Sequence, residues 1–161
     1  MYHLGLALLA QSRPAPLDQT ETHEALAQFQ SFMSRYPDHR LAPGAEKHIF
    51  AIRTKLAEKE YLNGKLYLRR DQHRPARQYF KEKVLKDYGD TKFAVLALLG
   101  LAESYNETHE WQKLADTCQD LLARFPKSHE AHRAKRLLEK AKKEGATMDI
   151  IPAPGDTTTS R

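Results

Sequence analysis

Two features of the sequence contain side chains that could do chemistry: a histidine pair and a single cysteine. His129 and His132 flank Glu130 and Ala131 in an arrangement that resembles the zinc-binding H-E-x-x-H motif with one residue missing. That motif places its histidines four residues apart on one helix face, and the metal needs a third ligand. Because both requirements are unmet here, the sequence predicts surface histidines and no metal site.

Cys118 is the only cysteine, which excludes an intramolecular disulfide and any multi-cysteine metal site. The sequence supplies no neighbouring base to activate it, so we expect a buried, unreactive thiol. No glycine-rich phosphate loop, dinucleotide fingerprint or G-x-S-x-G motif occurs. The sequence therefore predicts a protein that is not an enzyme and that has no cofactor.

Basic residues are the remaining candidates, as a surface for binding rather than catalysis. From Arg53 to Lys92 there are 12 Lys or Arg against 6 Asp or Glu. This excess fits a solvated rim or a docking surface for an acidic partner, whereas no aromatic interleaving or reader motif supports nucleic acid. We expect Tyr61 to face a groove as an interface anchor. The candidate protein-binding residues are Tyr61, Lys65, Arg69, Arg70, Arg74, Arg77 and Lys81.

The composition constrains the elements that must position these residues. With 161 residues, 40% hydrophobic and 29% charged, the chain suits one helical, highly solvated or elongated domain. Seven Gly and eight Pro are too few for a loop-rich all-β fold. The apolar run from Leu4 to Ala10 has no preceding Lys or Arg and is short for a signal peptide, so we expect a helix there.

Three turns in the sequence are versions of one another. They are residues 35–39 (RYPDH), 87–91 (DYGDT) and 124–128 (RFPKS). An alanine stands six and nine residues after each aromatic, and large apolar residues stand three and four residues before it. Large residues on one helix, a turn, and small residues on the next helix are typical of helical hairpins that pack closely in series.

The spacing within these repeats is typical of the tetratricopeptide repeat. We predict an all-α, tetratricopeptide-like helical-hairpin solenoid of about seven helices over residues 1–144, as the C-terminal part of a longer protein. Residues 145–161 are expected to be a flexible tail. The expected helices are 2–10, 22–36, an unusually long one at 41–70, 73–88, 91–107, 110–124 and 127–144.

Several runs resemble the BamD (YfiO or ComL) family of outer-membrane assembly lipoproteins. Residues 56–61 (LAEKEY) are similar to the family's L-A-x-x-E-Y run on a long helix, and residues 64–70 to its Tyr-containing end. Residues 84–91 (VLKDYGDT) are similar to its L-[RK]-D-Y-P-D-T run, with Gly89 in place of the usual proline. The resemblance covers roughly residues 2–142.

The resemblance implies a non-catalytic scaffold of the outer-membrane barrel-assembly machinery. It implies a place on the periplasmic face of the outer membrane and docking of the BamA periplasmic domain and accessory lipoproteins. The family's lipid-bearing cysteine is absent from this chain, so a membrane contact would need an anchor outside it. The alternatives are another envelope adaptor, such as a Tol-associated cell-division coordinator, and more distantly an RNA-binding helical repeat. The long helix and the LAEKEY run argue against the former.

Overall fold

The computed structural model describes residues 1–145, which form helices joined by short turns and contain no strand. Because α4, η1 and α5 follow one another without a break, the described residues form seven helical runs, as predicted. No helix in this part of the chain is both long and apolar enough to cross a membrane. The helices are α1 (Tyr2–Gln11), α2 (Thr20–Arg35), α3 (Ala42–Leu68), α4 (His73–Gln78), the π-helical η1 (Tyr79–Leu85), α5 (Lys86–Tyr88), α6 (Phe93–Glu107), α7 (Trp111–Arg124) and α8 (Glu130–Lys143).

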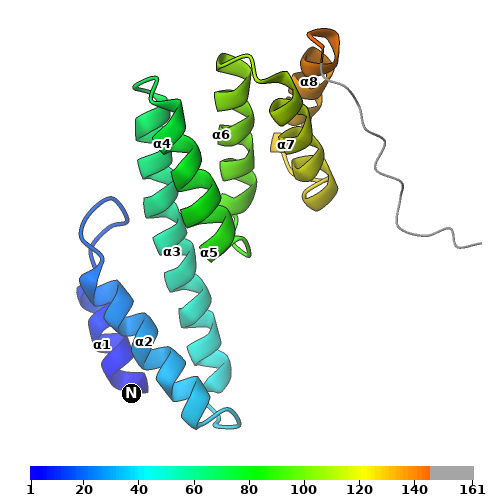
Figure 1. Ribbon diagram of the computed structural model, residues 1–161. Helices are drawn as coiled ribbons and strands as arrows, with labels where there is room; N and C mark the ends of the chain where they lie inside the picture. Colours follow the sequence, from blue (N-terminus) through cyan, green and yellow to red (C-terminus); the bar gives the residue numbers. More distant parts are fainter. Residues whose placement is uncertain (146–161) are drawn as a thin grey trace, which may run out of the picture.

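The helices stack as hairpins along the long helix α3 (Figure 1). The α1–α2 hairpin packs on the first half of α3, and the α4–α5 run lies along its second half, with α6, α7 and α8 following in series. This arrangement confirms the predicted all-α repeat fold. The predicted division at residue 144 stays a prediction, and apart from Gly145 the expected tail lies outside the described residues.

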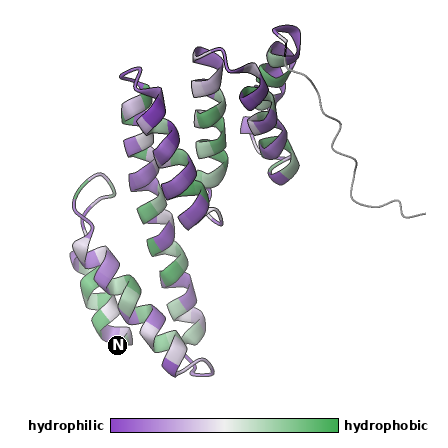
Figure 2. Cartoon of the chain, in the orientation of Figure 1, coloured by the Kyte–Doolittle hydropathy of each residue, from purple (hydrophilic) through white to green (hydrophobic). Residues whose placement is uncertain are grey.

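Two hydrophobic clusters hold the stack together, and α3 contributes to both. The first contains Phe29 with Ile52, and the second contains Phe80, Leu101, Leu114 and Leu121, all at most 2% exposed. The second cluster also contains three of the repeat alanines that follow the last two turns, Ala97, Ala131 and Ala134, at 0–3% exposure. The fourth, Ala94, is likewise fully buried. Figure 2 shows that α6 is largely apolar, as α1 is, while α4 and α5 are largely polar. The small residues therefore lie where the repeat pattern requires close helix packing.

Phe80 is the side chain around which the second cluster is built. It is fully buried, and a Cβ added at Gly64 would lie 2.5 Å from its Cε1, while one at Gly100 would lie 2.8 Å from its Cζ. The ring is therefore wedged between the backbones of α3 and α6. The helix that carries Phe80 is π-helical from Tyr79 to Leu85, a local widening that the apolar pattern does not signal.

Cys118 lies on α7 at 0% exposure, in the second cluster, as the repeat register predicts. Burial raises the pKa of its thiol to about 12. We therefore expect the folded protein to react with Ellman's reagent only as fast as it opens, and the denatured protein to react at once. A fast reaction of the native chain, timed by absorbance, would contradict this burial.

Candidate protein-binding surface

The seven predicted binding residues lie on one stretch of chain but in three different environments. Tyr61 and Lys65 are on the α3 face that packs toward α6, and Arg77 reaches from α4 into the junction of α6 and α7. The others are exposed on the turn after α3, on α4 or on η1: Arg69, Arg70, Arg74 and Lys81. The surface thus divides into anchored and free cations.

The turn between α3 and α4 presents the free cations. Asp71 has φ 56°, and the amide of Gln72 donates to the carbonyl of Tyr67 at 3.0 Å while that of Asp71 donates to Leu68 at 3.1 Å. This pair of bonds is a Schellman motif, which ends a helix with one left-handed residue. The turn that contains Arg69 and Arg70 is thereby fixed. Among the described residues these two arginines form no ion pair, and neither does Arg74, the second residue of α4.

Tyr61 is part of the packing between α3, η1 and α6. Its ring lies 6.0 Å from that of Phe80 and 5.6 Å from that of Phe93, between centroids. Burial, and then the nearby carboxylates of Glu103 and Glu130, raise the pKa of its hydroxyl. The ring therefore supports the core, and its expected role as an interface anchor stays a prediction.

Lys65 belongs to an ion chain that crosses three helices. Its Nζ lies 3.7 Å from Oε2 of Glu103 on α6, and Nη1 of Arg133 on α8 lies 3.0 Å from Oε1 of the same carboxylate. The Glu103 side chain is only 15% exposed, whereas that of Arg133 is 55% exposed. One partly buried carboxylate thus joins α3, α6 and α8 on a common face of the solenoid.

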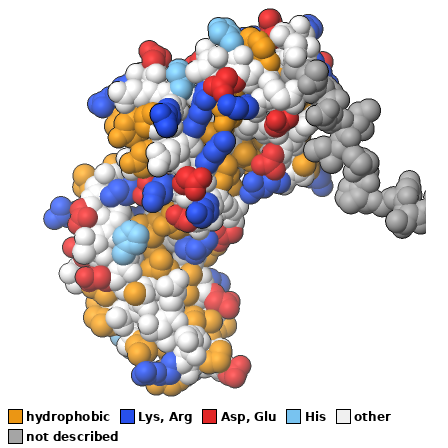
Figure 3. Space-filling model, in the orientation of Figure 1, with side chains coloured by type: hydrophobic (Ala, Val, Ile, Leu, Met, Phe, Trp, Pro, Cys, Tyr) orange, Lys and Arg blue, Asp and Glu red, His pale blue; other side chains and the backbone are white. Residues whose placement is uncertain are grey.

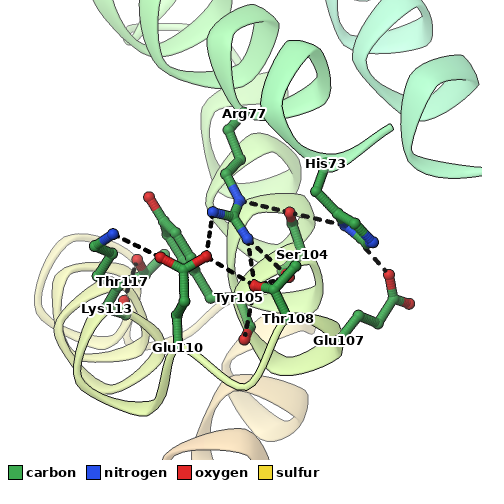
Figure 4. Close-up of polar contacts among 9 residues, drawn as sticks. All are labelled: His73, Arg77, Ser104, Tyr105, Glu107, Thr108, Glu110, Lys113 and Thr117. Carbon is green, nitrogen blue, oxygen red and sulfur yellow. Dashed lines mark hydrogen bonds and ion pairs between the residues drawn. The ribbon is translucent and has the colours of Figure 1, made fainter. Parts of the chain in front are cut away.

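Arg77 is the centre of a polar network rather than a free surface cation (Figure 4). Its Nε donates to Oγ of Ser104 at 2.7 Å, Nη1 to Oε1 of Glu110 at 2.5 Å, and Nη2 to the Ser104 carbonyl at 3.1 Å and to the Thr108 hydroxyl. Its guanidinium also lies 4.1 Å from the centroid of the Tyr105 ring. With a side chain 17% exposed, Arg77 fastens α4 to the α6–α7 junction.

Glu110 is the anionic partner in this network. Hydrogen bonds from Lys113 and then from Arg77, with a further one from Thr108, lower the pKa of its carboxyl from 4.5 to about 2. Glu110 follows His109, whose φ of 58° ends α6 in the same way as Asp71 ends α3. The position of Glu110 therefore depends on the left-handed turn at His109, which has the same form as the turn at Asp71.

A second clamp was not predicted from the sequence. Arg53 of α3 donates to both carboxylate oxygens of Asp90, at 3.1 and 2.5 Å, and to the carbonyl of Asp87 at 2.9 Å. This bidentate pair holds the turn between α5 and α6 against α3, and it lowers the pKa of the Asp90 carboxyl. The only sequence signal for it is Asp90 itself, in the repeated aromatic turn.

Basic side chains gather mainly over the α4–α8 half of the molecule and the adjoining part of α3 (Figure 3). Between residues 1 and 145, no three His, Cys, Asp or Glu side chains form a group that could hold a metal ion. The surface therefore offers charge and shape for binding.

Comparison with known proteins agrees with this description. The YfiO family model, described as outer membrane lipoprotein, matches residues 1–117. The outer membrane protein assembly factor BamD of Vibrio cholerae is 29% identical over 117 residues, which cover 66% of this chain and 48% of that relative. The chain thus spans about half the length of the curated relative that it matches. Because the family model covers well over half of the residues, and the helical repeats fit it, the chain belongs to the YfiO family of outer-membrane lipoproteins.

Proposed function

We propose that this protein is a non-catalytic scaffold of outer-membrane protein assembly that acts at the periplasmic face of the membrane. The observation that carries the proposal is the family match over residues 1–117, together with the name of the related protein, an outer membrane protein assembly factor. A helical solenoid also supplies a long surface for protein contacts without a deep pocket.

The proposed partners are the periplasmic domain of the barrel subunit BamA and accessory lipoproteins. The proposed contact surface is the basic turn, defined as Arg69, Arg70 and Arg74, with Lys81 at its edge. These side chains are exposed, and the turn that carries Arg69 and Arg70 is fixed by its Schellman bonds. Arg69, Arg70 and Arg74 form no ion pair among the described residues, whereas Nζ of Lys81 lies 5.5 Å from the centroid of the Tyr105 ring. Exposed cations without an ion pair favour an acidic partner, which they attract through electrostatic steering. Arg77 is left out because its side chain already binds Ser104 and Glu110.

The direct test is a calorimetric titration of this chain with the purified periplasmic domains of BamA from the same organism, at two salt concentrations. Saturable binding that weakens moderately at high salt is the expected result, since screening acts on exposed charges. A folded chain that binds none of the domains would contradict the proposed partner and leave the repeat fold unaffected.

The basic turn is tested by reversing its charges. The triple variant R69E/R70E/R74E should remain folded and lose binding to the BamA domains by ~100-fold or more, because three exposed cations become anions facing an acidic partner. Helicity by circular dichroism and affinity by titration are the two measurements.

A matched control reverses three exposed cations at the opposite end of the stack. The R35E/R40E/K47E variant changes the net charge by the same amount around the turn between α2 and α3. It should bind nearly as well as the natural chain. Equal losses in the two variants would show that only net charge matters and would remove the basic turn from the interface.

A further inference from the structure

The face that joins α3, α6 and α8 contains a second, separate feature: a hollow between α6 and α8. It has a volume of about 460 Å³ and is lined by Leu99 of α6 and by residues at the start of α8, namely His129, Glu130, His132, Arg133 and Arg136. Volumes of this order are typical of binding pockets. The α8 residues lie beyond residue 117, where the family-model match ends.

The charge on this hollow is only partly neutralised within the chain. Its lining contains two arginines, Arg133 and Arg136, and one carboxylate, Glu130. Arg133 is also paired with Glu103, which Lys65 shares. Arg136 lines the hollow, is exposed, and has no ion-pair partner among the described residues. The hollow therefore retains positive charge beside the apolar side chain of Leu99.

Helix α8 as a whole is positively charged. Its 14 residues include six Lys or Arg and two Glu, a net +4 in a chain whose net charge is +5. Glu139 offsets part of this charge, because its Oε1 lies 2.8 Å from Nζ of Lys142 and it stands three residues after Arg136. The remaining excess of cations favours an acidic partner.

We propose that the hollow between α6 and α8 binds an extended acidic peptide segment of a partner protein, with one apolar side chain of that segment against Leu99. The peptide carboxylates would pair with Arg133 and Arg136, which the groove presents side by side on one turn of α8. A membrane surface fits less well, because the apolar side chains of α8 are buried against the stack: Ala131, Ala134, Leu138 and Ala141. The site is separate from the basic turn, so either surface can fail its test without the other.

The test uses a fluorescein-labelled peptide of alternating Asp and Glu with one central Leu, followed by fluorescence anisotropy on the full chain. We expect saturable binding that the R136E variant weakens by ~10-fold or more, since an anion would then face the peptide carboxylates. The matched control is K142E, because position 142 lies ~240° around α8 from position 136, away from the hollow. It should change the affinity less than ~2-fold. If R136E loses helicity, R136Q serves in its place.

Three results would overturn the proposal. The first is no saturable binding of the acidic peptide by the folded chain. The second is equal weakening by R136E and K142E, which would reduce the effect to net charge. The third is sedimentation of the chain with phosphatidylglycerol vesicles, lost in R136E, while the peptide does not compete, which would assign the cations to anionic lipid. A peptide in which Gln and Asn replace the acids should not bind.

Discussion

Replacing Gly64 by alanine is expected to destabilise the protein when Phe80 is present and to stabilise it when Phe80 is absent. With the ring in place, the added methyl would lie 2.5–3.0 Å from three ring carbons, which is closer than van der Waals contact allows. Without the ring, we expect the better helix propensity of alanine over glycine to dominate. The sign of the change in unfolding free energy caused by G64A therefore tests directly whether the Phe80 ring is wedged between α3 and α6.

The expected magnitudes are large enough to measure by urea denaturation. F80A should lower the free energy of unfolding by about 3–5 kcal/mol, because it empties a fully buried site. G64A alone should lower it by about 1–3 kcal/mol through overpacking. In the F80A background, G64A should raise it by up to about 1 kcal/mol. If F80A does not fold, F80L supplies the background, and the penalty of G64A should then shrink.

The control for this cycle is Phe29, which is also fully buried but belongs to the other hydrophobic cluster. G64A and F29A should be additive, because residues that share no contacts do not couple. Additive behaviour of G64A with F80A as well would contradict the wedge. It would also mean that the need for a glycine at position 64 has a reason other than the packing of Phe80.

Replacing Arg77 by methionine should lower the free energy of unfolding by about 2–4 kcal/mol. This expected loss lies between those measured for exposed and for fully buried ion pairs, because the Arg77 side chain is 17% exposed. The substitution keeps the packing of the aliphatic stem but removes the hydrogen bonds to Ser104, Thr108 and Glu110. R69M, which changes an exposed arginine on the basic turn, should have an effect within about 0.5 kcal/mol. Equal effects of R77M and R69M would contradict the anchoring role of Arg77.

The same network predicts an acid dependence of stability. Because the pKa of Glu110 falls from 4.5 to about 2 on folding, its contribution is complete above pH 4.5 and is lost as the pH falls toward 2. Unfolding curves measured from pH 4.5 down to pH 2 should therefore show that E110Q loses less unfolding free energy over this range than the natural chain does. R77M should show an intermediate loss, since Lys113 still donates to the carboxylate. Identical pH profiles for E110Q and the natural chain would contradict the network.

Much of the fold follows from the repeat alone. Each predicted helix begins and ends within about three residues of the observed one. At the three repeated turns, Pro, Gly and polar residues stop the preceding helix. Ala97 and Ala134 are fully buried, as their place after the turns predicts. The π-helical segment η1 could not be predicted, because the apolar spacing is compatible with an ordinary α-helix. Its Phe80 packs against Gly64 and Gly100, which are distant in sequence, and a local pattern contains no information on that fit.

The division of the basic residues could not be predicted either. Arg74 and Arg77 look alike in the sequence, three residues apart on one short helix. One turns to solvent and the other meets Ser104 and Glu110, which follow 27 and 33 residues later. Which arginine is free is decided by the stacking of the next hairpin, and a local pattern contains no information on that contact.

The most direct measurement of the central claim is photo-cross-linking from the basic turn. A benzoylphenylalanine at position 70, in the protein assembled with its partners, should form a covalent adduct with the periplasmic domain of BamA. The same probe at the exposed position 46, at the far end of α3, should form none. An adduct from position 46 and none from position 70 would contradict the account, because the docking surface would then lie at the other end of the solenoid.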